Sequence, residues 1–243
     1  MTCEDSVKIC WPDKLPESLS GKIAVVIDIL AATTNIATFL DGGVGTLLLV
    51  NDRNVIVAKE KYPDAFVIGE SSKPQVAAIL TASNSPALLE KNDILAKIAG
   101  KTVLYLTNNG TKVISRVVEK GARMVTAASF ANFEKVLNWL KDGQLKDILL
   151  VPAGEINLTG GKAEEDYLCA KAIHNALVGR SISWPQLFSK VKKSIRKNYL
   201  ILYKRENLSA TVMEEDIQII TKLNSHKRVA ICKRRTDGLI FVT

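Results

Sequence analysis

The chain has 243 residues, of which 47% are hydrophobic and 24% charged, a composition that is ordinary for a globular protein and excludes a disordered chain. Its longest apolar runs are too short to span a bilayer, and residues 1–22 lack the basic and apolar regions of a signal peptide. We therefore expect a cytoplasmic protein that does not associate with membranes. The four cysteines form no C-x-x-C pair, so we expect neither a disulfide nor a zinc site.

The positive charge is confined to the C-terminal quarter of the chain. Residues 1–185 hold 20 Lys/Arg and 20 Asp/Glu, whereas residues 186–243 hold 13 and 5, which accounts for the whole net charge of +8. A basic segment of this kind can bind nucleic acid. It carries few aromatic residues and no recognised nucleic-acid motif, so the preferred interpretation is a solvated basic face. We expect no nucleic-acid partner.

From residue 23 to residue 178, short β-rich runs alternate with helical patterns, which predicts an α/β fold. The predicted strands are apolar and bounded by Gly, Asp or Asn, as buried and largely parallel strands are. They are Ile23–Ile29, Thr46–Val50, Ala65–Ile68, Thr102–Leu106, Arg123–Ala127 and Asp147–Val151.

The predicted helices between these strands end at Gly or Pro, which is typical of helix termination. They are Thr34–Leu40, Asn54–Lys61, Thr111–Lys120, Asn132–Lys141 and Ala163–Val178. Helical patterns at Gln186–Lys197 and Met213–Leu223 then precede two short strands, Val229–Cys232 and Leu239–Val242, with a hairpin turn at Thr236-Asp237-Gly238.

The predicted architecture is a three-layer α/β arrangement around a mostly parallel or mixed sheet, which the C-terminal helices and short strands extend. We expect one compact unit over residues 1–243, which can be subdivided into a core (1–180) carrying the active-site turns and a basic C-terminal extension (181–243).

Polar residues at the carboxyl ends of strands are the candidate functional residues, because ligands of open α/β sheets bind there. Asp28 interrupts an apolar strand, and a carboxylate in that place costs desolvation unless it is paired or bound to a metal. Glu70 follows the third predicted strand in the same way. We predict that Asp28 and Glu70 are catalytic; the alternatives are a hydrogen-bonded turn at Asp28 and an exposed loop glutamate at Glu70.

Further strand-to-helix turns offer hydroxyls, amides and helix N-termini to an anion. For each of them, ordinary helix capping or turn chemistry is the competing explanation; Ser85, for example, can cap a helix whose first residue is Pro86. The predicted substrate- or phosphate-binding residues are Thr33, Thr34, Asn84, Ser85, Asn108, Asn109, Gly110, Thr111 and Ser129.

Three acidic residues, Glu164-Glu165-Asp166, begin the helix after the sixth strand, and such a set suits a hard cation. The helix dipole alone explains one or two of them. We predict a Mg²⁺ site formed by Asp28, Glu165 and Asp166.

Six segments, taken in order, resemble the 2-phosphosulfolactate phosphatase family over about residues 23–180. They are Val25–Thr34, Gly69-Glu70, Ser83–Pro86, Thr107–Thr111, Ser129–Asn132 and Glu165–Ala170. The resemblance implies a hydrolase, a phosphatase that converts 2-phospho-3-sulfolactate and water to 3-sulfolactate and phosphate. It also implies dependence on Mg²⁺, a role in coenzyme M biosynthesis and a small anionic phosphorylated substrate.

Two departures from the family pattern affect this expectation. The family typically has an arginine where this chain has Ala31, and basic or glycine residues where it has Ser71-Ser72-Lys73. An arginine binds phosphate or sulfonate with two parallel hydrogen bonds, which alanine cannot do. The alternative is therefore a non-catalytic protein of the same fold that binds anions or other small molecules.

Two chemical mechanisms are compatible with these residues. Asp28 with Glu165 or Asp166 could position Mg²⁺ and an attacking water, or Asp28 could itself attack phosphorus. A homodimer is compatible with the sequence.

Overall fold

The computed structural model describes residues 6–144, 146–154, 163–205 and 208–243. Its centre is a 9-stranded sheet with the spatial order β1-β7-β2-β6-β8-β9-β3-β5-β4. The strands are β1 (Val7–Ile9), β2 (Ile23–Ile27), β3 (Thr46–Leu49), β4 (Phe66–Gly69), β5 (Thr102–Leu106), β6 (Met124–Ala128), β7 (Ile148–Pro152), β8 (Ala230–Arg234) and β9 (Ile240–Val242).

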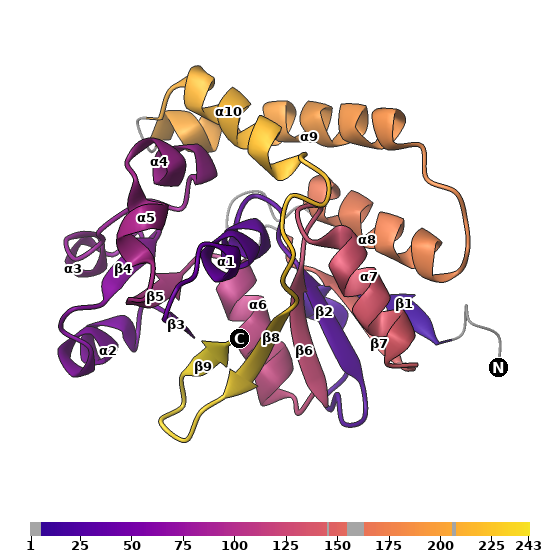
Figure 1. Ribbon diagram of the computed structural model, residues 1–243, viewed down its shortest axis with the longest axis horizontal. Coiled ribbons are helices and arrows are strands. Elements are labelled where there is room, and N and C mark those ends of the chain that lie inside the picture. The colour runs from indigo at the N-terminus through magenta and orange to yellow at the C-terminus, as the bar shows by residue number, and fades with distance from the viewer. Residues whose placement is uncertain (1–5, 145, 155–162, 206–207) are drawn as a thin grey trace.

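Helices pack on both faces of this sheet (Figure 1), which confirms the predicted α/β class. The α-helices of the described residues are α1 (Ala32–Asp41), α2 (Val55–Lys61), α3 (Pro74–Ala77), α4 (Pro86–Lys91), α5 (Ile94–Ile98), α6 (Gly110–Glu119), α7 (Phe133–Asp142), α8 (Glu164–Leu177), α9 (Trp184–Arg205) and α10 (Ala210–Ile220). All eight predicted strands and seven predicted helices have a counterpart here. The strand β1 and the short helices α3 and α5 were not predicted, and α9 continues well beyond Lys197.

The sheet consists of two parallel groups that run in opposite senses. In one group β1, β7, β2 and β6 are parallel, and in the other β3, β5 and β4 are parallel. The antiparallel pairs β6·β8, β8·β9 and β9·β3 connect them. In a flat sheet the carboxyl ends of the two groups would lie at opposite edges. The residues that follow β2 and β5 are nevertheless in contact, as described below, so the sheet bends until these ends face each other.

The β8–β9 hairpin corrects one expectation from the sequence. We expect these strands to extend the sheet, and they do belong to it, but they lie in its middle, between β6 and β3. The turn is the predicted one, with Gly238 at φ 82° and the amide of Arg235 donating to the carbonyl of Leu239 (2.8 Å). The hairpin is therefore the link between the two parallel groups rather than an edge.

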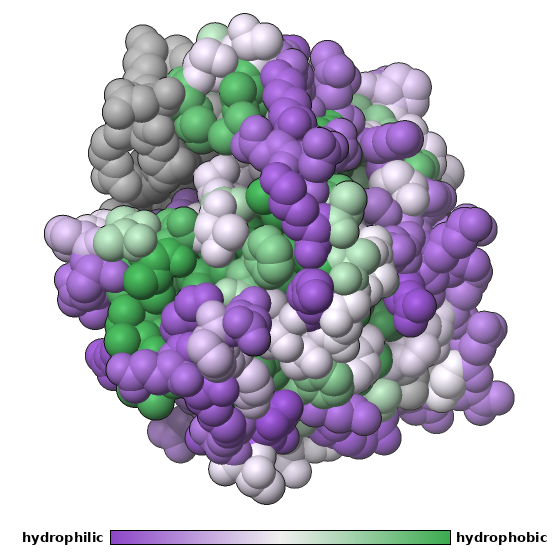
Figure 2. Space-filling view, turned by 60° about the vertical axis from the view of Figure 1, so that its left-hand side comes forward, coloured by the Kyte–Doolittle hydropathy of each residue, from purple (hydrophilic) through white to green (hydrophobic). Residues whose placement is uncertain are grey.

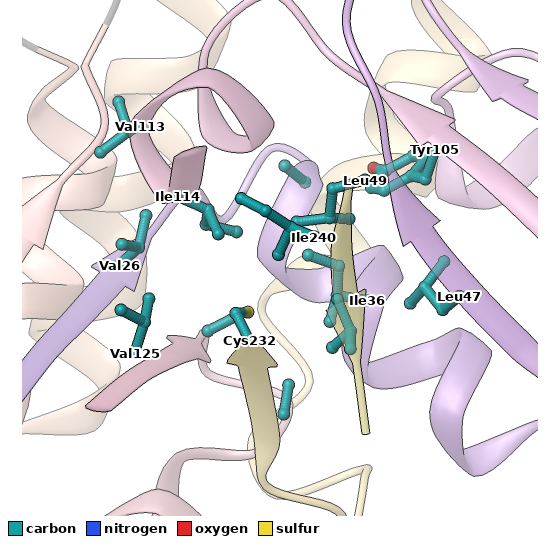
Figure 3. Packing of buried hydrophobic residues seen from close by; sticks show 14 of the residues in the cluster. Val26, Ile36, Leu47, Leu49, Tyr105, Val113, Ile114, Val125, Cys232 and Ile240 are labelled. Atoms are coloured by element: carbon teal, nitrogen blue, oxygen red, sulfur yellow. The ribbon is translucent and has the colours of Figure 1, made fainter. Parts of the chain in front are cut away.

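One hydrophobic core spans both parallel groups. Figure 3 shows buried side chains of β2, β6, β3, the hairpin and helices α1 and α6 turned toward one another. The labelled members are Val26, Val125, Leu47, Leu49, Tyr105, Cys232, Ile240, Ile36, Val113 and Ile114. A second cluster lies under α7–α10, and a third lies between α2 and the β3-β5-β4 group. Packing on both faces of each group therefore fixes where the strand ends lie.

The outer surface carries charged and apolar residues side by side. In the space-filling view of Figure 2, hydrophobic residues gather in the left-hand part of the face, and hydrophilic residues cover most of the rest. No helix of the described residues is both long and apolar enough to cross a membrane. Cys10, Cys169 and Cys232 are free thiols, and Cys3 lies outside the described residues.

Candidate active site

Four carboxyl groups from three parts of the chain influence one another at the carboxyl ends of the strands. Asp28 directly follows β2, Glu70 directly follows β4, and Glu165 and Asp166 lie in the first turn of α8. The charge of Glu70 and that of Glu165 both act on Asp28, and the charges of Asp28 and Glu165 both act on Asp166. We call these four residues the carboxylate cluster. Charge interactions thus link the two predicted catalytic residues and the three predicted metal ligands.

Asp28 is held by the turns on either side of it. The amide of Ala32 donates to its Oδ1 (3.3 Å), and the amide of Gly110 also donates to its carboxylate. The Thr33 hydroxyl donates to the Asp28 carbonyl (2.7 Å) and accepts from the Asp28 amide (3.0 Å). These contacts fix the carboxylate in a position where it is only 6% exposed.

The backbone at position 110 lies so close to Asp28 and Ala32 that only glycine fits there. A Cβ at position 110 would lie 2.4 Å from the Cβ of Ala32 and 2.6 Å from Oδ2 of Asp28, distances that real side chains do not tolerate. The Asn-Gly turn after β5 therefore serves to bring backbone against Asp28. We predict an anion-binding role for Gly110 from the sequence; the anion that its amide binds in the structure is the Asp28 carboxylate.

Glu70 lines a cavity of about 500 Å³. Its Oε1 accepts a hydrogen bond from the amide of Asn108 (3.0 Å), so the turn after β5 contacts both predicted catalytic carboxylates. Among the residues that the structure describes, polar side chains and a few apolar ones line the cavity, and neither lysine nor arginine is among them. Its lining residues are Gly69, Glu70, Ser71, Ser72, Leu80, Ala82, Ser83, Asn84, Asn108 and Leu208.

Asp166 and Glu165 are both buried and already have hydrogen-bond donors. The two oxygens of Asp166 accept from the amides of Ile29 (2.8 Å) and Gly154 (3.2 Å), which ties α8 to the ends of β2 and β7. The Oε2 of Glu165 accepts from the hydroxyl of Ser194 on α9 (3.0 Å). Each carboxylate therefore also holds neighbouring elements together.

Burial and mutual repulsion keep protons on this cluster. Burial first, and then the neighbouring charge of Glu70, raise the pKa of Asp28 to about 7, although the amides of Ala32 and Gly110 oppose the shift. Burial, followed by the charges of Asp28 and Glu165, raises the pKa of Asp166 well above its usual range. At neutral pH the cluster therefore cannot carry its full negative charge without a counter-charge.

The donor chemistry suits a hard cation such as Mg²⁺, because every candidate ligand is a carboxylate or amide oxygen. Among the residues that the structure describes, no three acidic, histidine or cysteine side chains are close enough to hold a metal ion by themselves. Mg²⁺ in phosphate-processing enzymes commonly takes one or two carboxylates and completes its shell with water and substrate oxygens. The cluster fits that mode and not a site enclosed by protein ligands alone.

Asn84 is oriented by two buried residues that sequence reasoning missed. The Oδ1 of Asn84 accepts from the hydroxyl of Tyr105 and from Nδ2 of Asn35 (3.0 Å), and Asn35 also donates to the Asn84 carbonyl (2.8 Å). The Oδ1 of Asn84 is thus held by two buried side chains, and Asn84 also lines the cavity. Tyr105 reads as an ordinary strand residue in the sequence, so no local signal indicates this role.

Ser85 has a structural role that depends on a distant residue. Its hydroxyl donates to the buried carboxylate of Asp216 on α10 (2.9 Å), and its oxygen accepts from the amide of Leu88 (3.3 Å), which is the predicted cap of α4. The amide of Ala87 also donates to Asp216 (2.8 Å). Ser85 therefore joins α4 to α10, and Asp216 was not singled out in the sequence.

The remaining predicted binding residues shape the turns from within. The hydroxyl of Thr34 donates to the carbonyl of Ile29 (2.9 Å), and that of Thr111 donates to the carbonyl of Thr107 (3.1 Å). Ser129 is fully buried after β6, and its hydroxyl accepts from the amide of Ala131 (3.2 Å). Only Asn84 and Asn108 of the predicted set line the cavity, and Asn109 is half-buried beside it.

The chain is similar in sequence to the proteins of one family. The family described as 2-phosphosulpholactate phosphatase matches residues 9–235. A protein of Thermotoga maritima named probable 2-phosphosulfolactate phosphatase is 37% identical over 153 residues, which cover 63% of this chain and 61% of that protein. A protein of Clostridium beijerinckii with the same name is 30% identical over 208 residues, covering 83% of each chain. The chain thus spans less than two thirds of the Thermotoga protein and most of the Clostridium protein.

Proposed function

The chain belongs to the 2-phosphosulfolactate phosphatase family, and from that premise we propose that it is a phosphatase acting on a small anionic phosphate monoester. The first candidate substrate is 2-phospho-3-sulfolactate, which would yield 3-sulfolactate and phosphate and would connect the chain to coenzyme M biosynthesis. The observation that carries the proposal is the buried Asp28 carboxylate, on which the charge of Glu70 acts, together with the position of Glu70 in the lining of the cavity. Burying like charges together costs free energy that a purely structural role does not explain.

We propose that Mg²⁺ is the missing counter-charge of the carboxylate cluster. Asp28 and Glu70 would hold it, because Glu70 lines the cavity and its charge acts on Asp28, and Glu165 and Asp166 would contribute their charge. When bound, such an ion neutralises phosphate oxygens and lowers the pKa of a bound water. In this proposal the direct ligands are Asp28 and Glu70, whereas the sequence predicts Asp28, Glu165 and Asp166.

The chain's own groups would position the substrate. Asn84 and Ser83 line the same cavity as Glu70, and an amide and a hydroxyl can donate to phosphate oxygens. The turn at 108–110 keeps both carboxylates in place through the amides of Asn108 and Gly110. Preorganised donors of this kind need no rearrangement when charge develops on the transferred group.

Two chemical routes agree with this arrangement. Asp28 either orients an attacking water, or attacks phosphorus itself, which breaks the ester P–O bond, releases the alcohol product and forms an aspartyl-phosphate that water then hydrolyses to phosphate and free Asp28. Trapping the reaction with a phosphate mimic, followed by mass spectrometry of the peptide that contains Asp28, separates them. A phosphoryl adduct on that peptide requires the covalent route.

The decisive test is phosphate release from 2-phospho-3-sulfolactate and a panel of small phosphate monoesters, with and without Mg²⁺. We expect release that requires the metal and that falls about a hundredfold or more in Asp28→Asn. Asp142→Asn, the same chemical change on an exposed residue of α7, is the matched control and should keep wild-type activity. Release that survives in Asp28→Asn would refute the proposed site.

A non-catalytic anion-binding protein is the second candidate function. The observation that favours it is Ala31. This residue follows Asp28 by three positions and stands where the family typically has an arginine. Saturable binding of the same phosphate esters by a folded protein that releases no phosphate would establish this alternative. Size-exclusion chromatography with light scattering would test the homodimer that we also propose.

A further inference from the structure

A second cavity, separate from the lining of the first, has the opposite charge. Its volume is about 510 Å³, and it lies between the segment after β3, the segment after β4 and the outer face of α6. Four cationic side chains and two acidic ones line it. The cations are Arg53, Lys73, Lys112 and Arg116, and the acids are Asp52 and Glu119. We call it the cationic cavity.

The four cations of this cavity form no ion pair with an acidic side chain of the described residues. Among the described residues, none of the four has an acidic partner within 4.0 Å. Other surface cations do, since Lys91 pairs with Glu215 and Arg196 with Glu214. Of the two acids in the cavity, Asp52 already accepts the hydroxyl of Ser71 (2.6 Å).

The cations also come from three segments that are far apart in the sequence. Arg53 follows β3, Lys73 follows β4, and Lys112 and Arg116 lie one turn apart on α6. A solvated helix face would explain Lys112 and Arg116 alone. It does not explain why Arg53 and Lys73, from two other segments, line the same cavity without an acidic partner in the part of the chain that the structure describes. Guanidinium groups on two sides of a hollow suit an anion that accepts several hydrogen bonds, such as a phosphate.

We propose that the cationic cavity binds a small ligand with several negative charges, of the phosphate ester or diphosphate class. The site is distinct from the carboxylate cluster, where negative charge accumulates and where neither lysine nor arginine is found among the described residues that line the cavity. It also adjoins the segment that carries Glu70, because Ser71 donates to Asp52 and accepts from the amide of Lys73 (3.1 Å). A ligand bound there would contact the loop that holds one of the predicted catalytic residues.

The test is calorimetric titration with inorganic pyrophosphate at low ionic strength, in buffer depleted of metal on a chelating resin. Without metal the carboxylate cluster repels anions, so saturable binding with one ligand per chain reports on the cationic cavity. In Arg53→Gln/Arg116→Gln the dissociation constant should rise about tenfold or more, because two charged donors are lost.

Two controls make the result interpretable. Lys135→Gln/Lys141→Gln removes the same charge from exposed positions on α7 and should change the dissociation constant by less than about twofold, as should Asp28→Asn. Circular dichroism checks that each variant is folded, and Lys73→Gln takes the place of the Arg double variant if that does not fold. Absence of saturable binding by the wild type, or an equal loss in the α7 control, would overturn the proposal.

Discussion

The carboxylate cluster gathers four acidic residues, and the cationic cavity has four cations against two acids, but the two sites lie in opposite surroundings. Asp28, Glu165 and Asp166 are buried, and burial is the first cause of the raised pKa of Asp28 and Asp166. Arg53, Lys73 and Arg116 are exposed, so water solvates their charges at little cost. The buried cluster must therefore be enforced by packing and backbone contacts. The exposed cluster needs only side chains of the right kind around a hollow.

This difference predicts what substitutions do at each place. Changes in the packing around Asp28 should alter both folding stability and activity, because the same contacts serve both. Changes in the cationic cavity should alter ligand binding and leave stability nearly as it was.

The largest effect is expected from Gly110→Ala. The added methyl group would collide with Ala32 and with the Asp28 carboxylate, so the turn must move away from both predicted catalytic residues. We expect a loss of about 1–3 kcal/mol in the free energy of unfolding, measured by urea denaturation, and a steep loss of phosphate release. Arg116→Gln on the same helix should change stability by less than about 0.5 kcal/mol. Equal stability of the two variants would contradict the contrast between the sites.

A smaller effect is expected from Tyr105→Phe. The substitution removes the hydroxyl that donates to Asn84 Oδ1, while the ring remains in the core against Phe39. We expect a cost of about 1 kcal/mol in unfolding free energy and a rise in KM of a few-fold, with kcat little changed. A merely structural role would leave KM unchanged, so an unaltered KM would show that Asn84 does not position the substrate.

Much of the fold was predictable because its signals are local. Apolar runs bounded by Gly, Asp or Asn mark most of the strands, and the Ser85-Pro86 pair correctly marks the start of α4. The predicted hairpin turn at Gly238 is also local and is confirmed. The position of that hairpin inside the sheet is decided by pairing with β6 and β3, which are remote in sequence, so no local pattern indicates it.

The candidate site was predictable to the same extent and for the same reason. A carboxylate at a strand end, as at Asp28 and Glu70, is visible in the sequence. The hydrogen bonds that the hydroxyls of Thr34, Thr111 and Ser85 form within the protein are visible only when the turns are folded. Asn35, Tyr105 and Asp216 act through residues 49, 21 and 131 positions away, and such distances carry no sequence signal.

The central claim is that the carboxylate cluster binds a cation. The pH dependence of the protein's folding stability provides the most direct test. Below about pH 4, Asp28 is protonated in both the native and the unfolded state. Between its ordinary value of 3.8 and about 7, the unfolded chain has lost a proton that the native chain keeps. The stability of the metal-free protein should therefore fall as pH rises through this window and level off above it.

The measurement is urea denaturation of the wild type and Asp28→Asn at pH 5 and pH 8, with and without Mg²⁺, beside Asp142→Asn as the control. We predict that saturating Mg²⁺ stabilises the wild type and the control by about 1–3 kcal/mol at pH 8 and by less at pH 5, because the ion binds the deprotonated cluster of the native state. Asp28→Asn should lose most of this stabilisation and show a weaker fall between the two pH values. An equal Mg²⁺ effect in Asp28→Asn, or none in the wild type, would contradict the claim.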